Sequence, residues 1–352
     1  MKILIYSDNH WCQYSSIVRK RGEKYSLRLE NQIKSLNWAE SLGEQYNVNA
    51  VVCCGDFFDT PVLNAEELSA LKEVTWNEKV PHYFIVGNHE MGSNDLQFNS
   101  VNALLSVPNA FIVDKVLSAR YPNDANILFL PYMLEENIKP LKEYMTDHLK
   151  FSNSTNDVIV FSHNDIKGIQ MGAFVSEKGF EISDIENNCA LFINGHLHNG
   201  TKVSDKVINV GNLTGQNFSE DAFKYEHCAY ILDTSTMRIQ VFENPFALNF
   251  YKIDLTDGKD WAIFDNIENA VLTVKCFEKD AKVLKNMFAE NSELSKHVIE
   301  IRYIIQPEII KDNNIETSQL KSVDHLEMFK NYILETLGNS ETVNKVLSEV
   351  IK

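Results

Sequence analysis

The sequence lacks any apolar segment long enough to cross a membrane. No apolar run approaches the roughly 20 residues that a transmembrane helix needs. The apolar run at residues 3–6 is also too short for the central part of a secretory signal. These absences predict an intracellular, cytoplasmic protein without a membrane span.

Cysteine pairs are also missing. The six cysteines are scattered, and none is spaced as Cys-x-x-Cys. This distribution indicates neither a disulfide framework nor a thiolate zinc site, so we expect reduced and mostly buried thiols.

Positive charge is scarce. The chain has 33 Lys and Arg against 49 Asp and Glu, and its formal net charge is −16. Because phosphate neutralisation supplies most non-specific affinity for nucleic acid, this balance argues against a broad basic binding surface. An anionic substrate would need a local source of positive charge, such as bound divalent metals or a basic partner subunit.

The 352 residues, 44% of them hydrophobic, suit two domains or one domain with a substantial appendage. Through about residue 250, short β-branched or aromatic runs end in polar turns, which is typical of strands. Between them, Leu29, Ile33, Leu36 and Ala39 share one face of a helix that Gly43 would end. Residues 64–67 resemble a capping box that opens another helix. This order predicts an α/β fold.

The pattern changes after about residue 250. Residues 271–277, 281–289 and 298–305 read as a compact strand, helix and strand. Two amphipathic helices are expected at 322–337 and 340–351, and their apolar faces could pack on the protein itself or dock on a partner.

Five of the predicted strands end in residue types that bind metals. The first strand is followed by Asp-Asn-His, later ones by GDFFD, GNHE, a single histidine and GHLH. The residues concerned are Asp8, His10, Asp56, Asp59, Asn88, His89, Glu90, His163, His196 and His198.

The polar turns that follow these strands can converge on one site. Loops at the carboxyl ends of strands converge in α/β folds, and alternate residues of an extended segment face the same side. Asp8 with His10, and His196 with His198, can therefore each reach a common centre. Glycines 55, 87 and 195 allow the backbone to approach closely. The donors are oxygen and nitrogen, which favours ions such as Mn²⁺ or Fe²⁺ over structural zinc.

Taken singly, each motif has a plain alternative, because Asp-x-His and His-x-His occur in solvated turns and Gly-Asn-His-Glu in N-capped turns. Their order and shared position at strand ends favour a metal site. Two adjacent divalent metals are machinery for phosphoester hydrolysis.

The ordered set resembles the calcineurin-like metallophosphoesterase superfamily across residues 8–198. The resemblance implies a four-layer α/β fold, in which a β-sandwich is flanked by helices. It also implies two divalent metals, one held by Asp8, His10, Asp56 and His198 and the other by Asp56, Asn88, His163 and His196. His89 would be the catalytic histidine that protonates the leaving oxygen or steadies the transition state.

Within the superfamily, Thr60-Pro61 after the second motif weakens a protein serine/threonine phosphatase interpretation, and Phe57-Phe58 excludes the tyrosine ligand of purple acid phosphatases. The layout resembles the SbcD nuclease family, including phage recombination exonuclease subunits. That resemblance implies a Mn²⁺-dependent DNA nuclease, with Mg²⁺ or Fe²⁺ as other candidate ions. It would act as a 3′ to 5′ exonuclease and as an endonuclease in DNA repair and recombination.

The same resemblance implies three domains: a nuclease domain at 1–250, a small α+β cap at 251–308, and a helical segment at 309–352. That last segment would bind an SMC-like ATPase, SbcC, and two copies of the chain could also form a homodimer. Two other functions stay open, a stand-alone metallophosphatase or cyclic-nucleotide phosphodiesterase, and an inactive adaptor.

Two features depart from the usual family pattern. His10 is followed by Trp11-Cys12, and the third motif ends in Glu90 where aspartate is more common. The loop after His10 contains Arg19, Lys20 and Arg21, which form either a solvated charge run or a contact to the DNA backbone. Five further histidines match no motif and are expected to be structural: His82, His148, His227, His297 and His325.

Overall fold

The computed structural model describes residues 1–13, 21–94, 96–121, 125–149, 157–171, 174–257, 261–290 and 292–307. The chain divides into one compact unit, Met1–Gln306, and a second, Pro307–Lys352. The helices predicted at 322–337 and 340–351, and the domain predicted at 309–352, lie outside the described residues. None of the described helices is long and apolar enough to span a membrane.

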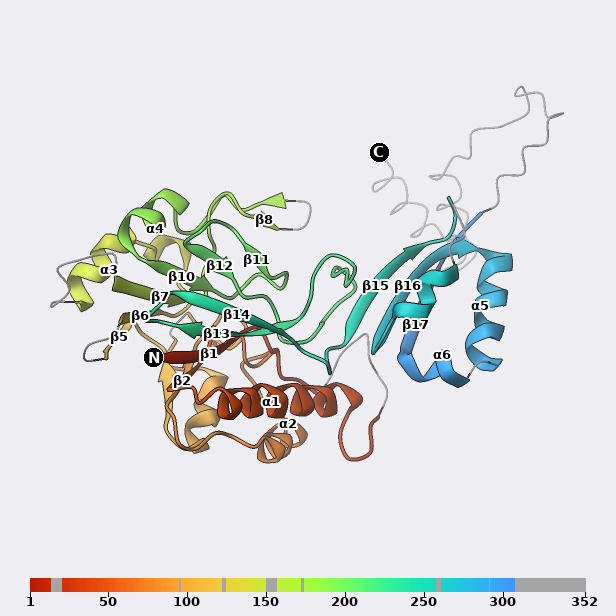
Figure 1. Ribbon diagram of the computed structural model, residues 1–352, viewed down its shortest axis with the longest axis horizontal. Coiled ribbons are helices and arrows are strands. Elements are labelled where there is room, and N and C mark those ends of the chain that lie inside the picture. The colour runs from red at the N-terminus through yellow and green to blue at the C-terminus, as the bar shows by residue number, and fades with distance from the viewer. Residues whose placement is uncertain are drawn as a thin grey trace, which may run out of the picture. The chain divides into compact units, whose positions relative to one another are not determined.

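Two six-stranded sheets form the core of the described part of the chain (Figure 1). The first has the order β14-β13-β1-β2-β3-β4, with β1 (Lys2–Tyr6), β2 (Ala50–Cys53), β3 (His82–Ile85), β4 (Ala110–Val113), β13 (Cys228–Asp233) and β14 (Arg238–Glu243). The second has the order β11-β12-β10-β7-β6-β5, with β5 (Leu117–Arg120), β6 (Asn126–Leu130), β7 (Val158–Ser162), β10 (Leu191–Asn194), β11 (Thr201–Lys202) and β12 (Val207–Asn209).

The two sheets pack against each other, and helices cover their outer faces. Along β1, Ile3 and Ile5 join the apolar cluster between the sheets, whereas Leu4 and Tyr6 face the opposite way. The first sheet is covered by α1 (Leu27–Gln45) and α2 (Ala65–Ala70), and the second by α3 (Leu141–His148) and α4 (Ile182–Asn188). Both faces of the central strands are buried, as expected for parallel strands with helices on the outside. The predicted four-layer α/β sandwich is confirmed.

Helix α1 departs from the prediction at its end. It continues past Gly43 to Gln45, and the left-handed residue that ends it is Asn47, with φ of 52°. The N–H groups of Asn47 and Val48 donate to the carbonyls of Glu44 and Gly43, which is a Schellman arrangement. Gly43 serves packing instead, because a Cβ there would lie 3.3 Å from Leu4 Cδ2. The prediction that Gly43 ends the helix was wrong.

The capping box predicted at the start of α2 is confirmed. The Asn64 side chain accepts from the backbone N–H groups of Glu66 and Glu67, and the Glu67 carboxylate accepts from the Asn64 N–H. Smaller elements complete the core: the 3₁₀ turns η1 (Leu71–Glu73), η2 (Ser100–Ser106) and η3 (Glu135–Asn137), and the short pair β8 (Gln170–Met171) and β9 (Phe174–Val175).

A third sheet follows the core. It consists of β15 (Asn249–Asp254), β16 (Ala270–Phe277) and β17 (Val298–Gln306), all parallel, with the 3₁₀ turn η5 (Trp261–Asn266) and the helices α5 (Glu278–Glu290) and α6 (Ser292–His297). This confirms the strand, helix and strand read from residues 271–305. We call residues 249–306 the cap. The domain boundary predicted at residue 250 lies inside the first compact unit and stays a prediction.

The parallel strands bring the polar loops of each sheet to one edge of that sheet. β1, β2 and β3 are parallel neighbours in the first sheet, as are β6, β7, β10 and β12 in the second. Their carboxyl ends therefore open at common edges, which is where ligand-binding loops meet in α/β proteins.

Candidate metal centre

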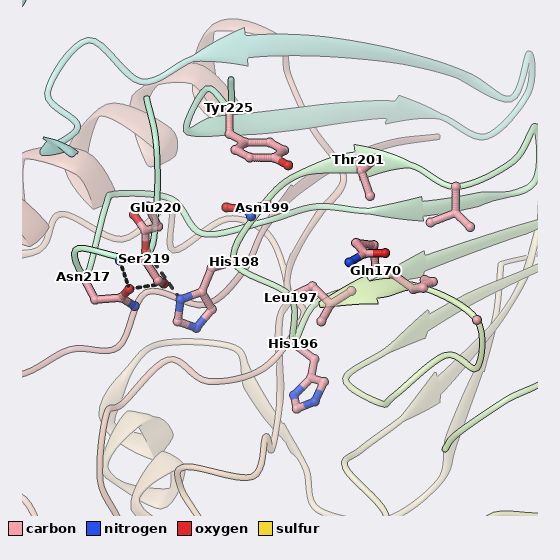
Figure 2. A pocket seen from close by; sticks show the side chains of 13 residues that line it. Gln170, His196, Leu197, His198, Asn199, Thr201, Asn217, Ser219, Glu220 and Tyr225 are labelled. Carbon is pink, nitrogen blue, oxygen red and sulfur yellow. Dashed lines mark hydrogen bonds and ion pairs between the residues drawn. The ribbon is translucent and has the colours of Figure 1, made fainter. Parts of the chain in front are cut away.

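The turn after β10 sends two histidines in different directions (Figure 2). His196 has a left-handed backbone, with φ of 75°, while Leu197 between the histidines packs on the apolar cluster beneath the second sheet. A Cβ on Gly195 would lie 2.9 Å from His163 Nδ1, so only glycine lets the chain pass here. His196 and His198 consequently reach separate groups of side chains.

The first group contains Asp8, His10 and His198, whose candidate ligand atoms all lie within 4.8 Å of one another. His10 Nε2 lies 4.0 Å from Asp8 Oδ1, and both side chains are buried. Among the described residues, neither of these two atoms has a hydrogen-bond partner. Buried polar atoms are normally paired, so two such atoms without a hydrogen-bond partner that lie close together suit the binding of a cation.

The second group contains Asp56, His163 and His196, again with candidate ligand atoms within 4.8 Å. Asp56 Oδ2 lies 3.1 Å from His163 Nε2. The amide oxygen of Asn88 lies 3.3 Å from His163 Nε2 and 3.0 Å from His196 Nδ1. Asn88 therefore belongs with this group.

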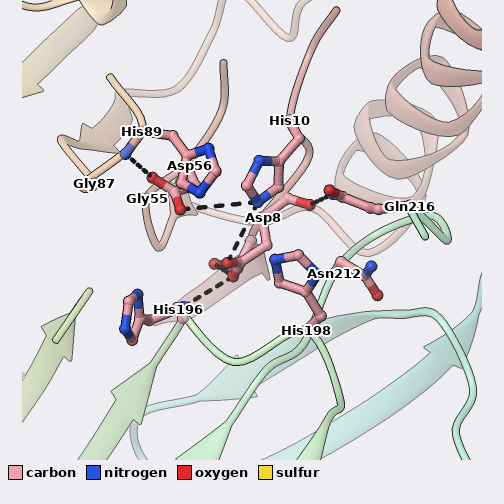
Figure 3. Close-up of polar contacts among 12 residues, drawn as sticks. Asp8, His10, Gly55, Asp56, Gly87, His89, His196, His198, Asn212 and Gln216 are labelled. Carbon is pink, nitrogen blue, oxygen red and sulfur yellow. Dashed lines mark hydrogen bonds and ion pairs between the residues drawn. The ribbon is translucent and has the colours of Figure 1, made fainter. Parts of the chain in front are cut away.

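Asp56, a member of the second group, also faces His10 of the first group (Figure 3). Its Oδ2 atom is 3.8 Å from His10 Nε2 as well as close to His163, and its Oδ1 atom accepts from the His89 backbone N–H at 3.0 Å. One carboxylate thus faces both groups, which is the position that a bridging ligand needs.

Left-handed backbone conformations, and not extended ones, bring these side chains together. Asp8, His10 and Asp56 have φ of 49°, 43° and 48°, so these loops are not extended. The prediction that alternation along an extended segment aligns Asp8 with His10 was wrong in its reason. Left-handed non-glycine residues are uncommon and cluster at functional sites.

Asp56 and His163 of the second group shift each other's pKa values in opposite directions. Burial acts to lower the pKa of His163, but the Asp56 carboxylate outweighs it and raises the pKa to about 10. Burial acts to raise the pKa of Asp56, but His163 outweighs it and lowers the pKa. By contrast, burial lowers the pKa of His10, whose free nitrogen then suits a metal. Ligand imidazoles must be neutral, so metal binding at His163 would displace a proton.

The predicted catalytic histidine lies at the solvent side of the site. The His89 side chain is 42% exposed, so a substrate can reach it. Its Nδ1 atom lies 3.0 Å from the Asp59 carbonyl oxygen, and its ring centre lies 4.5 Å from that of His10. The Asp59 carboxylate also lies 3.0 Å from His10 Nδ1. Asp59 therefore orients both histidines; the second motif marked it as a residue of metal-binding type, but the ligand sets implied by the family resemblance did not include it.

Glu90 holds two of the loops in register. Its buried carboxylate accepts from the N–H of Phe58 at 2.9 Å and from the N–H of Gly87 at 2.7 Å. Burial, with repulsion from Asp56, raises the pKa of Glu90 to about 8. Glu90, which stands where the family more often has aspartate, thus connects the second and third motifs through two hydrogen bonds.

Two further acidic residues contact the histidines of the last motif. Asp165 Oδ1 lies 3.3 Å from His196 Nε2, and Glu220 Oε1 lies 3.5 Å from His198 Nδ1. Carboxylates of this kind orient metal-binding imidazoles. Asp165 could have been suspected two positions after His163, whereas no local signal marks Glu220.

Glu220 belongs to a segment, residues 212–220, that contacts both the site and the cap. On the site side, Gln216 Nε2 donates to the Asp8 carbonyl at 2.6 Å. On the cap side, Lys252 Nζ donates to the Ser219 carbonyl at 2.7 Å, and Arg302 lies 5.3 Å from the centre of the Phe218 ring. His227, expected to be structural, is buried with Nδ1 2.7 Å from Asn212 Oδ1.

The predicted DNA contacts are only partly described. Arg21 Nη1 donates to Glu66 Oε1 at 2.6 Å, and Arg21 Nη2 donates to the Lys24 carbonyl at 3.1 Å. Arg19 and Lys20 lie outside the described residues. All seven predicted metal ligands, in contrast, lie together with His89 at the strand ends.

Carboxylate, amide and imidazole donors on two facing groups fit two divalent ions. The sequence model for the calcineurin-like phosphoesterase family matches residues 1–200. The chain therefore belongs to the calcineurin-like phosphoesterase family, and its activity class is that of a metal-dependent phosphoesterase.

Several solved structures are similar to the chain. An archaeal phosphodiesterase is 16% identical, covers 69% of this chain and 99% of its own, and has a TM-score of 0.35. A dimetal phosphatase from Danio rerio is 14% identical, covers 69% and 98%, and has a TM-score of 0.38. The E. coli phosphoesterase Yfce is 13% identical, covers 69% and 100%, and has a TM-score of 0.29. No curated protein matches the chain.

Proposed function

We propose that the protein is a DNA nuclease subunit of the SbcD type. It hydrolyses DNA phosphodiester bonds with two Mn²⁺ ions, as a 3′ to 5′ exonuclease and as an endonuclease, in DNA repair or recombination. The observation that carries this proposal is the cap. A parallel three-stranded unit contacts residues 212–220, and the same segment contacts His198 and Asp8. Enzymes that act alone on small phosphoesters rarely need such an addition.

Each part of the site has a role in this chemistry. Asp8, His10 and His198 would hold one ion, His163, His196 and Asn88 the other, and Asp56 would face both. Bound together, such ions act as Lewis acids and stabilise the charge that develops during in-line displacement at phosphorus. His89, oriented by Asp59, would donate a proton to the departing sugar oxygen.

The charge balance favours a second candidate. The net charge is −16, and Arg21, the one predicted DNA contact among the residues that the structure describes, is paired with Glu66. A stand-alone phosphatase or cyclic-nucleotide phosphodiesterase needs no extended basic surface, because its small substrate is held at the metals. DNA binding by this chain would instead depend on the metals and on a partner subunit.

The deciding experiment compares substrates on the full chain. Purified protein with Mn²⁺ is given end-labelled duplex DNA, bis(p-nitrophenyl) phosphate, a 3′,5′-cyclic nucleotide and p-nitrophenyl phosphate, each with and without chelator. We expect DNA cleavage that chelator, Asp56→Ala and His89→Ala abolish or strongly reduce. Cleavage of the small esters alone would favour the second candidate. DNA cleavage that persists in chelator or in Asp56→Ala would overturn the two-metal site.

The partner is a separate proposal. We propose that residues 309–352 bind a coiled-coil ATPase of the SbcC type, as the resemblance implies. Co-purification of the full chain with the product of a neighbouring ATPase gene, compared with a chain truncated after residue 308, tests it. Equal binding by both chains would place the contact elsewhere.

A further inference from the structure

Helix α1 has a buried polar face beside the loop that follows β1. Arg28, Gln32 and Ser35 are spaced by four and three residues, so they share one side of the helix, and each is at most 2% exposed. Buried polar side chains normally have hydrogen-bond partners. Gln32 finds its partners in the loop that contains His10, a proposed ligand of the first group.

Gln32 uses its whole amide on that loop. Its Nε2 atom donates to the carbonyl oxygen of Asn9 at 2.6 Å and to that of His10 at 2.8 Å, and its Oε1 atom accepts from the Cys12 N–H at 3.3 Å. Both amide hydrogens are therefore in use. Among the described residues, no other group donates to the carbonyls of Asn9 and His10. One side chain of α1 thus holds residues 9–12 by three hydrogen bonds.

The conformation of this loop needs such support. Asp8 and His10 have left-handed backbones, which are unfavourable for residues with a Cβ and persist where the surroundings fix them. The N–H groups of Asp8 and His10 donate to the carbonyls of Gly55 and Asp56 at 3.0 and 2.9 Å. Gln32 fixes the opposite, carbonyl side of the loop. Without it, the peptide groups around His10 could rotate, and the imidazole would leave its place in the first group.

The contacts of Gln32 concern only one of the two groups. His10 belongs to the first group, and its Nε2 atom lies 4.0 Å from Asp8 Oδ1. Within the part of the chain that the structure describes, the Gln32 side chain forms hydrogen bonds only with residues 9–12. The ligands of the second group lie on other loops. A loss of Gln32 should therefore affect the two metal positions unequally.

Arg28 connects the same loop with residues 212–220, the segment that contacts the other two ligands of the first group. Its Nη1 atom donates to the Gly215 carbonyl at 2.5 Å, and its guanidinium lies beside the Cys12 thiol. The first group is therefore oriented from α1 and from one segment that is fixed to α1.

We propose that Gln32 is a positioning residue for the metal that the first group binds. It acts by holding the His10 backbone in the conformation that turns the imidazole toward the other ligands. The proposal rests on the two-metal centre of the proposed function, but not on DNA as the substrate. A buried amide that only stabilised the fold would instead weaken both metal positions alike.

The test measures metal binding to the full chain. Mn²⁺ is titrated into metal-free protein and followed by calorimetry and by electron paramagnetic resonance, which distinguishes an isolated Mn²⁺ ion from a spin-coupled pair. Gln32→Met removes all three hydrogen bonds at similar volume, and Gln32→Glu keeps the shape and the acceptor but loses the donors. If one of these variants does not fold, the other decides.

Two reference variants and one control complete the set. His10→Ala and Asn88→Ala mark the loss of the first and of the second position. Ser35→Ala is the matched control, because Ser35 lies on the same buried face of α1 and its Oγ atom accepts from Asn244 Nδ2 at 2.9 Å, with no contact to a ligand loop.

We expect both Gln32 variants to lower Mn²⁺ affinity at one position by about 10- to 100-fold, as the loss of a group that orients a metal ligand does. The other position should stay near the wild-type value. At low Mn²⁺ the variants should resemble His10→Ala and show the isolated ion, and excess Mn²⁺ should restore the coupled pair in Gln32→Met. Ser35→Ala should match the wild type.

Unchanged affinity at both positions in a folded Gln32 variant, or equal losses at both, would overturn the proposal. Failure of both variants to fold would overturn it too, because Gln32 would then support the fold as a whole. In each of these cases a coupled Mn²⁺ pair in the wild type leaves the two-metal centre standing. A wild type that binds no Mn²⁺ pair would overturn the centre and the role of Gln32 together.

Discussion

The Oε1 atom of Glu220 lies 3.5 Å from Nδ1 of His198, and Glu220 belongs to the segment, residues 212–220, that also contacts the cap. The carboxylate accepts from Asn212 and Gln216 as well, so it is fixed before it orients the imidazole. We therefore expect a substitution of Glu220 to alter the orientation of His198 and so the affinity of the centre for metal.

We predict that Glu220→Gln lowers affinity for Mn²⁺ at one of two positions by about 10- to 100-fold, because the imidazole loses its charged partner. Calorimetric titration of the full chain with Mn²⁺ measures it. Asp205→Asn is the control, because that carboxylate is 96% exposed and pairs with Lys202 at the surface. Equal affinities for wild type and Glu220→Gln would remove Glu220 from the site.

Gly55→Ala should disrupt the second group of ligands. Gly55 has φ of 98°, and a Cβ there would lie 2.7 Å from the Cβ of His163. We expect loss of activity together with a lower melting temperature. Gly168→Ala is the control for backbone strain without a steric clash, because Gly168 has φ of 86° and open space around it. It should cost only about 1–2 kcal/mol and leave activity intact. Similar behaviour of the two variants in thermal denaturation and ester hydrolysis would contradict this.

Glu90→Ala should destabilise the fold as well as the site. It leaves the buried N–H groups of Phe58 and Gly87 without their acceptor, at about 1–3 kcal/mol each. Urea denaturation measures the free energy of unfolding. Glu181→Ala is the control, because the Glu181 carboxylate pairs with Lys167 at the surface and its loss should cost within about 1 kcal/mol. A loss of activity in Glu90→Ala without any loss of stability would give Glu90 a chemical role instead.

Metal removal should lower stability. A ligand that binds only the folded state adds about 2.7 kcal/mol at 100 times its dissociation constant. For a protein of 352 residues, that corresponds to a rise in melting temperature of roughly 3–5 °C. Differential scanning fluorimetry with Mn²⁺ and with chelator measures it, and Asp56→Asn should abolish the difference. An unchanged melting temperature in saturating Mn²⁺ would contradict metal binding at this centre.

Much of the fold could be predicted because its signals are local. Buried parallel strands appear as short apolar runs, and the Asn64 capping box follows from two side chains three residues apart. The end of α1 was predicted wrongly because it, too, was read from a local signal. Glycine is common at helix ends, which is why Gly43 was predicted to end α1. In the structure Gly43 packs against Leu4, a contact that no local pattern records, and Asn47 provides the left-handed turn.

For the site, the sequence by itself determined the ligand types, their order and their placement after strands, because each motif is a short stretch of chain. Only the tertiary structure decided how these residues meet. It placed Asp56 close to His10 of one group and His163 of the other, gave Asp8 and His10 left-handed backbones, and brought Glu220 to His198. Contacts between distant segments depend on how sheets and loops pack, and no local pattern of residues records that packing.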